Sequence, residues 1–161
     1  MSDKGSIIFG GRYELKKRIA RGGMAEVFLG EDQLLGRPVA VKVLFPEFAS
    51  DPNFVERFRR EAQAAANLSH PNIVGVFDWG KERNTYYIVM EYVEGRTLSQ
   101  IIRKEGPLPT ARIAEIADAI ASAVGFAHKG NVVHRDMKPG NVIISDSGQI
   151  KVADFGIATA I

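Results

Sequence analysis

The polar loop at residues 134–141 constrains this chain more than any other stretch of its sequence. Apolar pieces lie on either side of it, Val132-Val133 before and Val142-Ile143-Ile144 after, and we expect both to be strands. Flanking strands hold a loop rigid while its side chains stay open to a cleft, which favours chemistry at that place. The loop contains an acid, basic side chains, an amide and a proline that restrains the backbone. We therefore expect a fold that holds this loop rigid with its side chains open to a cleft.

The composition is that of a globular chain with one sizeable core. The 161 residues are 45% hydrophobic and 25% charged, with a formal net charge of +2. This mixture of charges predicts no nucleic-acid partner and no membrane-surface patch. The sequence has no cysteine, which excludes disulfides, thiolate nucleophiles and cysteine-based zinc sites. No apolar run reaches the ~18 residues of a membrane span, so we expect the chain to lie in the cytoplasm.

The first part of the chain is expected to form a five-stranded antiparallel sheet with one main helix. Residues 1–11 are polar and glycine-rich, which predicts a flexible lead-in. Asp51 followed by Pro52 is a typical helix start, with the acid as N-cap and the proline in the first turn. The predicted strands are 13–19, 26–30, 39–44, 73–79 and 86–92. The helix would turn one apolar face inward, made of Phe54, Val55, Phe58, Ala62, Ala65 and Ala66.

The second part is expected to be mainly helical, after a break at Gly95-Arg96. A short helix is predicted over 97–104 and a long one over 110–129, closed by Gly130. A hairpin is expected to turn at 146–148. The chain thus divides into segments 12–93 and 94–161. The long helix has one apolar face, made of Ile113, Ile116, Ala117, Ile120, Val124 and Ala127. It needs several neighbours, because further apolar residues fill much of its remaining surface, namely Ala111, Ala114, Ala119, Ala121, Ala123 and Phe126.

Two features of the first part suit a polyphosphate ligand. Backbone amides approach phosphates closely only where side chains are small, and a short run between the first two predicted strands has this character. Lys42 would place a cation on the phosphates and needs an anionic partner, for which Glu61 on the following helix is the candidate. The residues of the run are Ala20, Arg21, Gly22, Gly23, Met24, Ala25, Glu26 and Val27.

The second part holds the candidates for metal binding and catalysis. Asn141 and Asp154 offer the hard oxygen ligands that Mg²⁺ prefers, and one hairpin separates them. Asp136 would orient a substrate hydroxyl, and Lys138 would neutralise the charge of a transferring phosphoryl group. His134 is expected to be a packed, hydrogen-bonded histidine rather than a base.

The sequence resembles the eukaryotic-type protein kinases, and most of all their bacterial Ser/Thr branch. The loop at 134–141 fits H-R-D-x-x-x-x-N, residues 39–42 are close to V-A-I-K, and D-F-G stands at 154–156. The pattern G-x-G-x-x-G-x-V is met at Gly22 and Val27, whereas Ala20 and Ala25 replace its outer glycines. Lys138 resembles Ser/Thr rather than Tyr specificity. The resemblance runs from residue 13 to residue 161.

This resemblance implies an α+β protein-kinase fold, with a complete sheet-rich N-lobe and a partial, mainly helical C-lobe. It also implies ATP with Mg²⁺, or Mn²⁺ in its place, and protein substrates with Ser or Thr acceptors. The chain would end inside the activation segment, and the whole protein would in this branch often be anchored in a membrane outside this chain. Besides the residues already named, the nucleotide would be contacted by Ile19, Ala40, Met90, Glu91, Val93 and Ile143.

Three other interpretations stay open at this point. A pseudokinase or nucleotide-dependent interaction module would explain the alanines at positions 20 and 25, although Lys42, Asp136 and Asp154 are all present. A small-molecule kinase would share the fold, but Lys138-Pro139 argues against it. Truncation would leave the long helix uncovered and favour self-association or segment exchange between chains. We expect the 161-residue chain itself to have little or no turnover.

Overall fold

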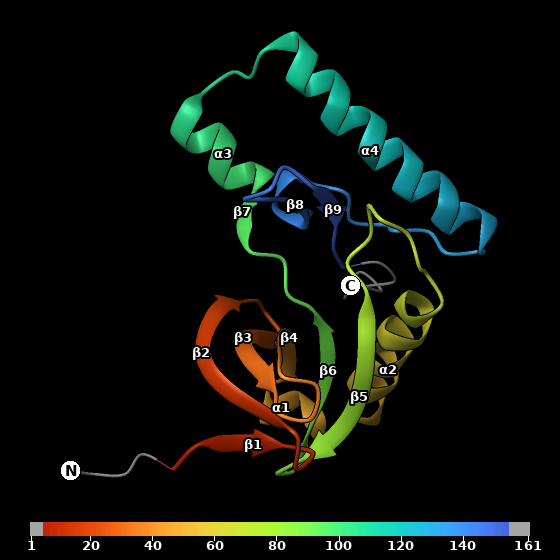
Figure 1. Ribbon diagram of the computed structural model, residues 1–161. Coiled ribbons are helices and arrows are strands. Elements are labelled where there is room, and N and C mark those ends of the chain that lie inside the picture. The colour runs from red at the N-terminus through yellow and green to blue at the C-terminus, as the bar shows by residue number, and fades with distance from the viewer. Residues whose placement is uncertain (1–4, 155–161) are drawn as a thin grey trace. The chain divides into compact units, whose positions relative to one another are not determined.

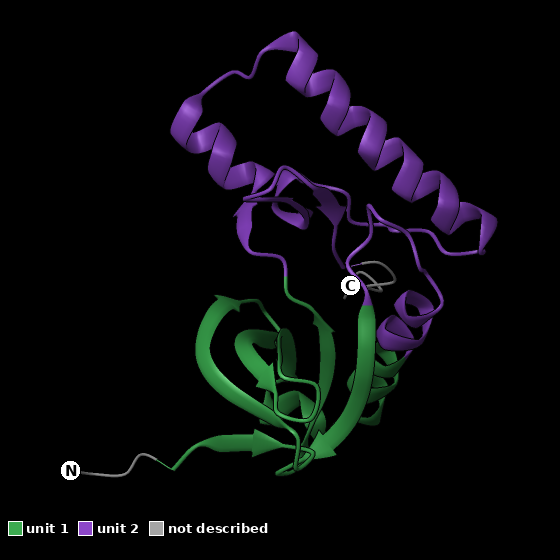
Figure 2. Cartoon of the chain, in the orientation of Figure 1, with its two compact units in different colours: residues 1–59, 76–92 green, residues 60–75, 93–161 purple. Residues whose placement is uncertain are grey.

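The computed structural model describes residues 5–154, and the chain divides into two compact units (Figure 2). The first unit contains the residues up to 59 together with 76–92. The second contains 60–75 together with the residues from 93 onward. The predicted motif at 154–156 is described only at Asp154, and Phe155 and Gly156 lie outside the described residues.

The first unit is built on an antiparallel sheet of six strands in the order β1-β2-β3-β4-β6-β5 (Figure 1). The α+β class is as expected, but the sheet has six strands rather than five. The strands extend beyond most of their predicted limits because pairing continues to the turns. Their bounds are β1 Ile7–Phe9, β2 Tyr13–Arg21, β3 Ala25–Asp32, β4 Arg37–Leu44, β5 Val76–Glu82 and β6 Thr85–Glu91.

The added strand β1 lies in the segment 1–11 that we predicted to be a flexible lead-in, and residues 7–9 of this segment pair with β2. Phe9 pairs with Tyr13 across the β1–β2 turn and is only 5% exposed. Its ring lies 5.3 Å from the Tyr87 ring, between centroids. Burial of an aromatic side chain of this size stabilises this short strand, whose three residues, Ile-Ile-Phe, also favour strand structure.

Strand β4 shows how the sheet separates its two faces. Val39, Val41 and Val43 point into a core cluster that also contains Tyr87 and Val89. Because side chains alternate along a strand, the residues between these valines lie on the opposite face. That second face carries Ala40, Lys42 and Leu44.

An ion pair between the partly exposed Arg12 and the buried Asp32 holds the turn between β3 and β4. Arg12 donates from Nε and Nη2 to the two carboxylate oxygens of Asp32, at 2.9 and 2.8 Å. The same carboxylate accepts the backbone N–H groups of Leu34 and Leu35, at 3.0 and 3.2 Å. The Arg12 hydrogen bond, with these backbone donors, lowers the pKa of Asp32 to about 2 against the opposing effect of its burial.

Asp32→Asn is expected to lower the melting temperature by several degrees at neutral pH. In the folded wild type the pKa of Asp32 lies below its ordinary value of 3.8, so its contribution is complete above about pH 4 and lost as the pH falls towards 2. The variant should lack this part of the acid dependence. Thermal unfolding followed by circular dichroism between pH 2 and 7 measures both effects. Glu31→Gln is the control, because Glu31 pairs with Lys16 at the surface and such pairs stabilise little; equal effects of both substitutions would contradict the assignment.

Two helices follow β4, and the second begins as predicted. The helix α2 spans Pro52–Ala66, and Asp51 caps it by accepting the Asn53 N–H at 2.9 Å. A short helix α1, Pro46–Ala49, precedes it and was not predicted. Phe58, Ala62 and Ala65 are buried as expected, but Ala66 is exposed, because the chain leaves the helix there and Leu68 takes the inward position.

The second unit contains a small sheet, β7-β8-β9, beside two helices. The helix α3, Leu98–Glu105, begins with a capping box between Thr97 and Gln100. The helix α4, Thr110–Lys129, ends at Gly130 as expected. The strands are β7 Gly95–Thr97, β8 Val142–Ser145 and β9 Ile150–Val152, and the 3-10 turn η1 covers Pro139–Asn141.

Three boundaries in the second unit differ from the predictions. Gly95-Arg96 was expected to be a break but pairs with β8 as part of β7. Val132 and Val133 form no strand, because the Val132 N–H closes the end of α4 by donating to the Ala127 carbonyl at 2.9 Å. The strand predicted over 73–79 begins only at Val76. Ile73 instead forms an isolated bridge with Val152 and belongs to a buried cluster with Leu68, Ala123, Ala127 and Val152.

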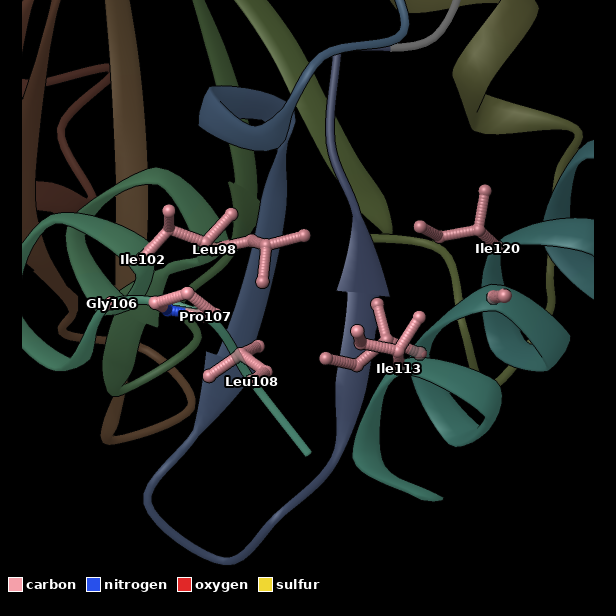
Figure 3. A pocket seen from close by; sticks show the side chains of 9 residues that line it. Leu98, Ile102, Gly106, Pro107, Leu108, Ile113 and Ile120 are labelled. Carbon is pink, nitrogen blue, oxygen red and sulfur yellow. The ribbon is translucent and has the colours of Figure 1, made fainter. Parts of the chain in front are cut away.

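The helix α4 buries only one narrow stripe, formed by Ile116, Ala119, Ala123 and Ala127. An apolar pocket of about 420 Å³ lies between α3, the following loop and α4. Figure 3 shows side chains from both helices and the loop around it, among them Ile102 and Ile113, which are 42% and 51% exposed. Its lining residues are Leu98, Ile102, Gly106, Pro107, Leu108, Ile113, Ile116, Ala117 and Ile120. Among residues 5–154, no helix has the length and apolar character needed to cross a membrane.

Candidate active site

Asp136 is held on both sides of its backbone by other members of the polar loop. Its N–H donates to Nδ1 of His134 at 3.1 Å, and its carbonyl accepts Nδ2 of Asn141 at 2.8 Å. Because the N–H and the carbonyl of Asp136 are both hydrogen-bonded, the backbone that carries its carboxylate is fixed in position. The Asp136 side chain itself stays partly exposed. This arrangement suits a group that must orient an incoming hydroxyl.

His134 is a packed and hydrogen-bonded histidine, as the sequence predicts. It is 2% exposed, and its Nε2 lies 2.7 Å from the carbonyl oxygen of Ala153. Since Nδ1 accepts the Asp136 N–H, the two bonds fit a neutral imidazole with its proton on Nε2. The imidazole thus connects the polar loop to the end of β9.

The hairpin β8–β9 brings the two predicted metal ligands to one end. Val142 pairs with Val152, and one step further the Ala153 N–H donates to the Asn141 carbonyl at 2.8 Å. Asp154 follows directly and has φ of 62°, a left-handed conformation that Asp and Asn adopt more readily than most residues. Asn141 is 6% exposed, and its Nδ2 donates to the Asp136 carbonyl. This hydrogen bond fixes the orientation of the Asn141 amide within the loop.

These two residues fit Mg²⁺ better than a metal held by protein groups alone. Among residues 5–154, no group of three or more His, Asp or Glu side chains is arranged to hold a metal ion. Mg²⁺ is usually bound by one or two carboxylates while water and substrate phosphates complete its shell. Asp154 and the amide oxygen of Asn141 are the donors that would take part.

Lys138 lies beside Asp136, the candidate catalytic base. Its Nζ is 3.3 Å from Oδ2 of Asp136, and both side chains are partly open to solvent, with relative exposures of 57% and 37%. An ammonium at this place can neutralise charge that develops near the carboxylate. The neighbouring Arg135 is exposed and has φ of 70°, so the loop carries an unusual backbone conformation directly before Asp136.

Five residues predicted to contact the nucleotide share one face of the sheet in the first unit. Val27 stands opposite Lys42, and Ala40 stands opposite Met90. Paired residues project to the same side of a sheet, and Ala40 and Lys42 are two positions apart on β4. Ala20 is opposite Val27 and so joins this face. We name Ala20, Val27, Ala40, Lys42 and Met90 the nucleotide face.

Other predicted contacts do not lie on this face. Glu26 is paired with Val43 across the sheet and forms an ion pair with Arg18 at 3.6 Å, both on the opposite side. Arg21 pairs with Glu26 and shares that side. Glu91 is opposite Val39 and likewise belongs to the core side, so only its backbone is available to the predicted role. Ile19 lies at a β-bulge in β2 and is 43% exposed.

The loop between β2 and β3 is a tight turn of small residues. The Gly22 N–H donates to the Ala25 carbonyl at 2.8 Å, and the Phe45 N–H donates to the Met24 carbonyl at 2.8 Å. Within the described part of the chain, the N–H groups of Gly23 and Met24 donate to no backbone carbonyl. A Cβ added at Gly23 would meet nothing within 4 Å. The loop tip therefore offers open backbone donors of the kind that bind phosphate.

The remaining predicted residues lie in the second unit. Val93 directly follows the boundary, and Ile143 lies on β8 opposite Lys151. Glu61 on α2 also belongs to this unit, whereas Lys42 belongs to the first. The pairing of Lys42 with Glu61 therefore stays a prediction.

Sequence reasoning missed the part played by the Ala153 backbone. Its carbonyl receives the hydrogen bond from His134, and its N–H is bonded to Asn141. A backbone group leaves no signature in residue type, so only the register of β8 and β9 could have revealed it. His70 accepts the Asn72 N–H at 3.0 Å, and its Nε2 lies 3.2 Å from Oγ of Ser122.

Comparisons with known proteins agree with this geometry. The protein kinase domain model matches residues 13–161. The serine/threonine-protein kinase PrkC of Bacillus subtilis is 52% identical over 151 residues, which cover 94% of this chain and 23% of PrkC. PknA of Mycobacterium tuberculosis is 45% identical over 166 residues, covering 100% of this chain and 38% of PknA.

A solved structure shows the same fold. The crystal structure of the Mycobacterium tuberculosis PknI kinase domain matches with a TM-score of 0.83 at 36% identity, over 96% of this chain and 63% of that one. The chain thus spans well under half the length of the two curated relatives, and less than two thirds of the solved kinase domain. The resemblance in the motifs is confirmed, since the family model covers nearly the whole chain, and the chain belongs to the protein kinase domain family.

Proposed function

We propose that this chain carries the catalytic loop and nucleotide-binding sheet of a serine/threonine protein kinase, which transfers the γ-phosphate of ATP to protein hydroxyls with Mg²⁺. The observation that carries the proposal is the network around Asp136, in which His134, Asn141 and Ala153 restrain the loop and the end of β9 together. Phosphoryl transfer depends on positioning and charge neutralisation, and this network supplies positioning. The relatives named above are serine/threonine kinases, which supports the choice of acceptor.

Each residue has a role in this proposal. Asp136 orients the acceptor hydroxyl and takes its proton, while Lys138 neutralises charge on the transferring group. Asn141 and Asp154 would hold Mg²⁺, which would supply positive charge to neutralise the phosphates. Lys42 contacts the phosphates with Glu61 as its partner, and the small residues of the β2–β3 loop cover them. Val27, Ala40, Met90 and Ile143 would enclose the base, with Glu91 and Val93 offering backbone groups.

Lys42→Met is the experiment that tests the nucleotide-binding part of the proposal. Removing a charge-assisted contact should weaken ATP binding about tenfold or more, while adenosine binding should change little. Titration calorimetry with ATP and adenosine, in the presence of Mg²⁺, measures both on the 161-residue chain. Lys104→Met is the matched control, because Lys104 is an exposed lysine of α3 in the second unit. Unchanged ATP affinity in Lys42→Met would contradict this role.

The same titrations separate a kinase from a nucleotide-dependent interaction module. A kinase that positions Mg²⁺ through Asp154 should bind ATP more tightly when Mg²⁺ is present. Tight binding that does not depend on metal would favour the interaction module. Phosphorylation of generic protein substrates, measured on the longest natural polypeptide that contains this chain, would separate a protein kinase from a small-molecule kinase. We propose that the reaction takes place in the cytoplasm.

We also infer that the 161-residue chain, when isolated, associates with itself through the pocket between α3 and α4. The pocket is lined by apolar residues, and Ile102 and Ile113 stand partly exposed in it. An uncovered apolar surface of this kind favours association. Sizing across a range of concentrations should show species larger than a monomer, and Ile113→Glu should shift them to the monomer. Lys104→Glu, on the exposed side of α3, is the charge control; a monomer at every concentration would count against the inference.

A further inference from the structure

The loop between β2 and β3 is attached to the end of β4 by two side-by-side contacts. The guanidinium carbon of Arg21 lies 5.2 Å from the centroid of the Phe45 ring, which is a cation–π distance. Directly beside it, the Phe45 N–H donates to the Met24 carbonyl at 2.8 Å. Phe45 therefore contacts the loop at both of its ends, because Arg21 precedes the turn and Met24 closes it.

These contacts lie on the side of the sheet opposite to the nucleotide face. Arg21 is opposite Glu26 on β3, and Glu26 is opposite Val43 on β4, so all three project to the core side of the sheet. Lys42 projects to the other side. The guanidinium of Arg21 is thus engaged on the side away from Lys42, and it leaves the open donors of Gly23 and Met24 unobstructed.

The loop tip has little other support. Gly22 and Gly23 carry no side chain, and a Cβ at Gly23 would meet nothing within 4 Å. A flexible loop must lose conformational freedom when it closes on a ligand, and each residue fixed in advance reduces that cost. Contacts that fix the loop backbone from the side opposite to the nucleotide can therefore raise the affinity for the phosphates, although their side chains do not touch the phosphates.

We propose that Arg21 and Phe45 form a clip that positions the β2–β3 loop for the phosphates of the nucleotide. Both are positioning residues, because they act through the loop backbone. The proposal rests on the proposed function, in which this loop covers the phosphates of ATP. This role of Arg21 differs from the one predicted from the sequence, which is direct contact with the nucleotide.

The experiment compares two ligands that share the base and differ in the phosphates. Phe45→Leu removes the aromatic face and keeps an apolar side chain of similar bulk. It should weaken ATP binding about fivefold, as expected from the loss of one cation–π contact, and change adenosine binding less than twofold. Arg21→Gln should have the same effect, and the double variant should be no weaker than either single variant, because the clip acts as a unit. Titration calorimetry on the 161-residue chain gives all these constants.

Two further variants separate positioning from charge and from folding. Phe45→Tyr keeps the aromatic face and should restore wild-type ATP affinity. Lys104→Gln removes one exposed charge from α3 and should leave ATP affinity within twofold, so a loss equal to that of Arg21→Gln would reassign the effect to net charge. Arg21 is exposed, so Arg21→Gln still tests the clip if Phe45→Leu proves unstable.

The outcomes distinguish this proposal from the proposed function. If the wild-type chain binds no ATP, the proposed function fails. If the wild type binds ATP and the clip variants bind it equally well, only the clip is overturned. Equal loss of ATP and adenosine affinity would also overturn it, because such a loss would show a general structural effect rather than positioning of the loop.

Discussion

Asp136→Asn is expected to abolish phosphoryl transfer while leaving the affinity for ATP nearly unchanged. The substitution keeps the size of the side chain and both backbone hydrogen bonds, to His134 and from Asn141. It removes the carboxylate that would accept the proton of the substrate hydroxyl. A positioned general base contributes about 10²–10⁴-fold to a rate, so a loss of that size is expected in kcat. The ATP affinity should stay, because Asp136 acts on the acceptor.

The measurement needs a chain with turnover, so it should be made both on the 161-residue chain and on the longest natural polypeptide that contains it. Transfer from labelled ATP and calorimetric ATP affinity are determined for the same preparations. Asp146→Asn is the control, since Asp146 lies in the exposed turn between β8 and β9 and donates its backbone N–H to the Glu94 carbonyl. An Asp136→Asn variant that loses ATP affinity as well as transfer would disprove the role given to this residue.

Asp154→Asn is expected to remove the dependence of ATP binding on Mg²⁺ without unfolding the protein. Asparagine tolerates the left-handed backbone that Asp154 adopts, at φ of 62°, so the substitution adds no strain. It replaces a charged oxygen ligand by a neutral one, which binds Mg²⁺ far less well. Metal ions supply several kcal/mol of charge stabilisation in such reactions, so transfer should fall by about a hundredfold or more.

ATP titrations with and without Mg²⁺ test this expectation on the 161-residue chain. In the wild type, Mg²⁺ should strengthen binding, whereas in Asp154→Asn the two curves should nearly coincide. The melting temperature should change little, which separates a ligand effect from loss of structure. Asp136→Asn serves as the comparison, because it should keep the full response to Mg²⁺. A normal metal response in Asp154→Asn would remove this residue from the metal site.

The secondary structure was largely predictable from local signals, and the exceptions have a common cause. Asp51 and Pro52 mark the start of α2, and Gly130 the end of α4, through capping chemistry that any helix shares. The strand β1 and the pairing of Gly95 in β7 were missed, because each becomes a strand only by pairing with another segment, the adjacent β2 for β1 and the distant β8 for β7. Val132 and Val133 were wrongly expected to be a strand, because an apolar pair does not reveal that its backbone closes a helix.

The candidate residues could be identified from the sequence because phosphoryl transfer requires particular side chains in a particular order. Which of them share a surface could not, because a face depends on strand register. The tertiary structure alone showed that Lys42 and Val27 project together while Glu26 and Arg21 project away. It also revealed that the Ala153 backbone connects His134 and Asn141 at the end of β9. Residue types carry chemical identity, whereas backbone hydrogen bonds and register arise only when distant segments pair.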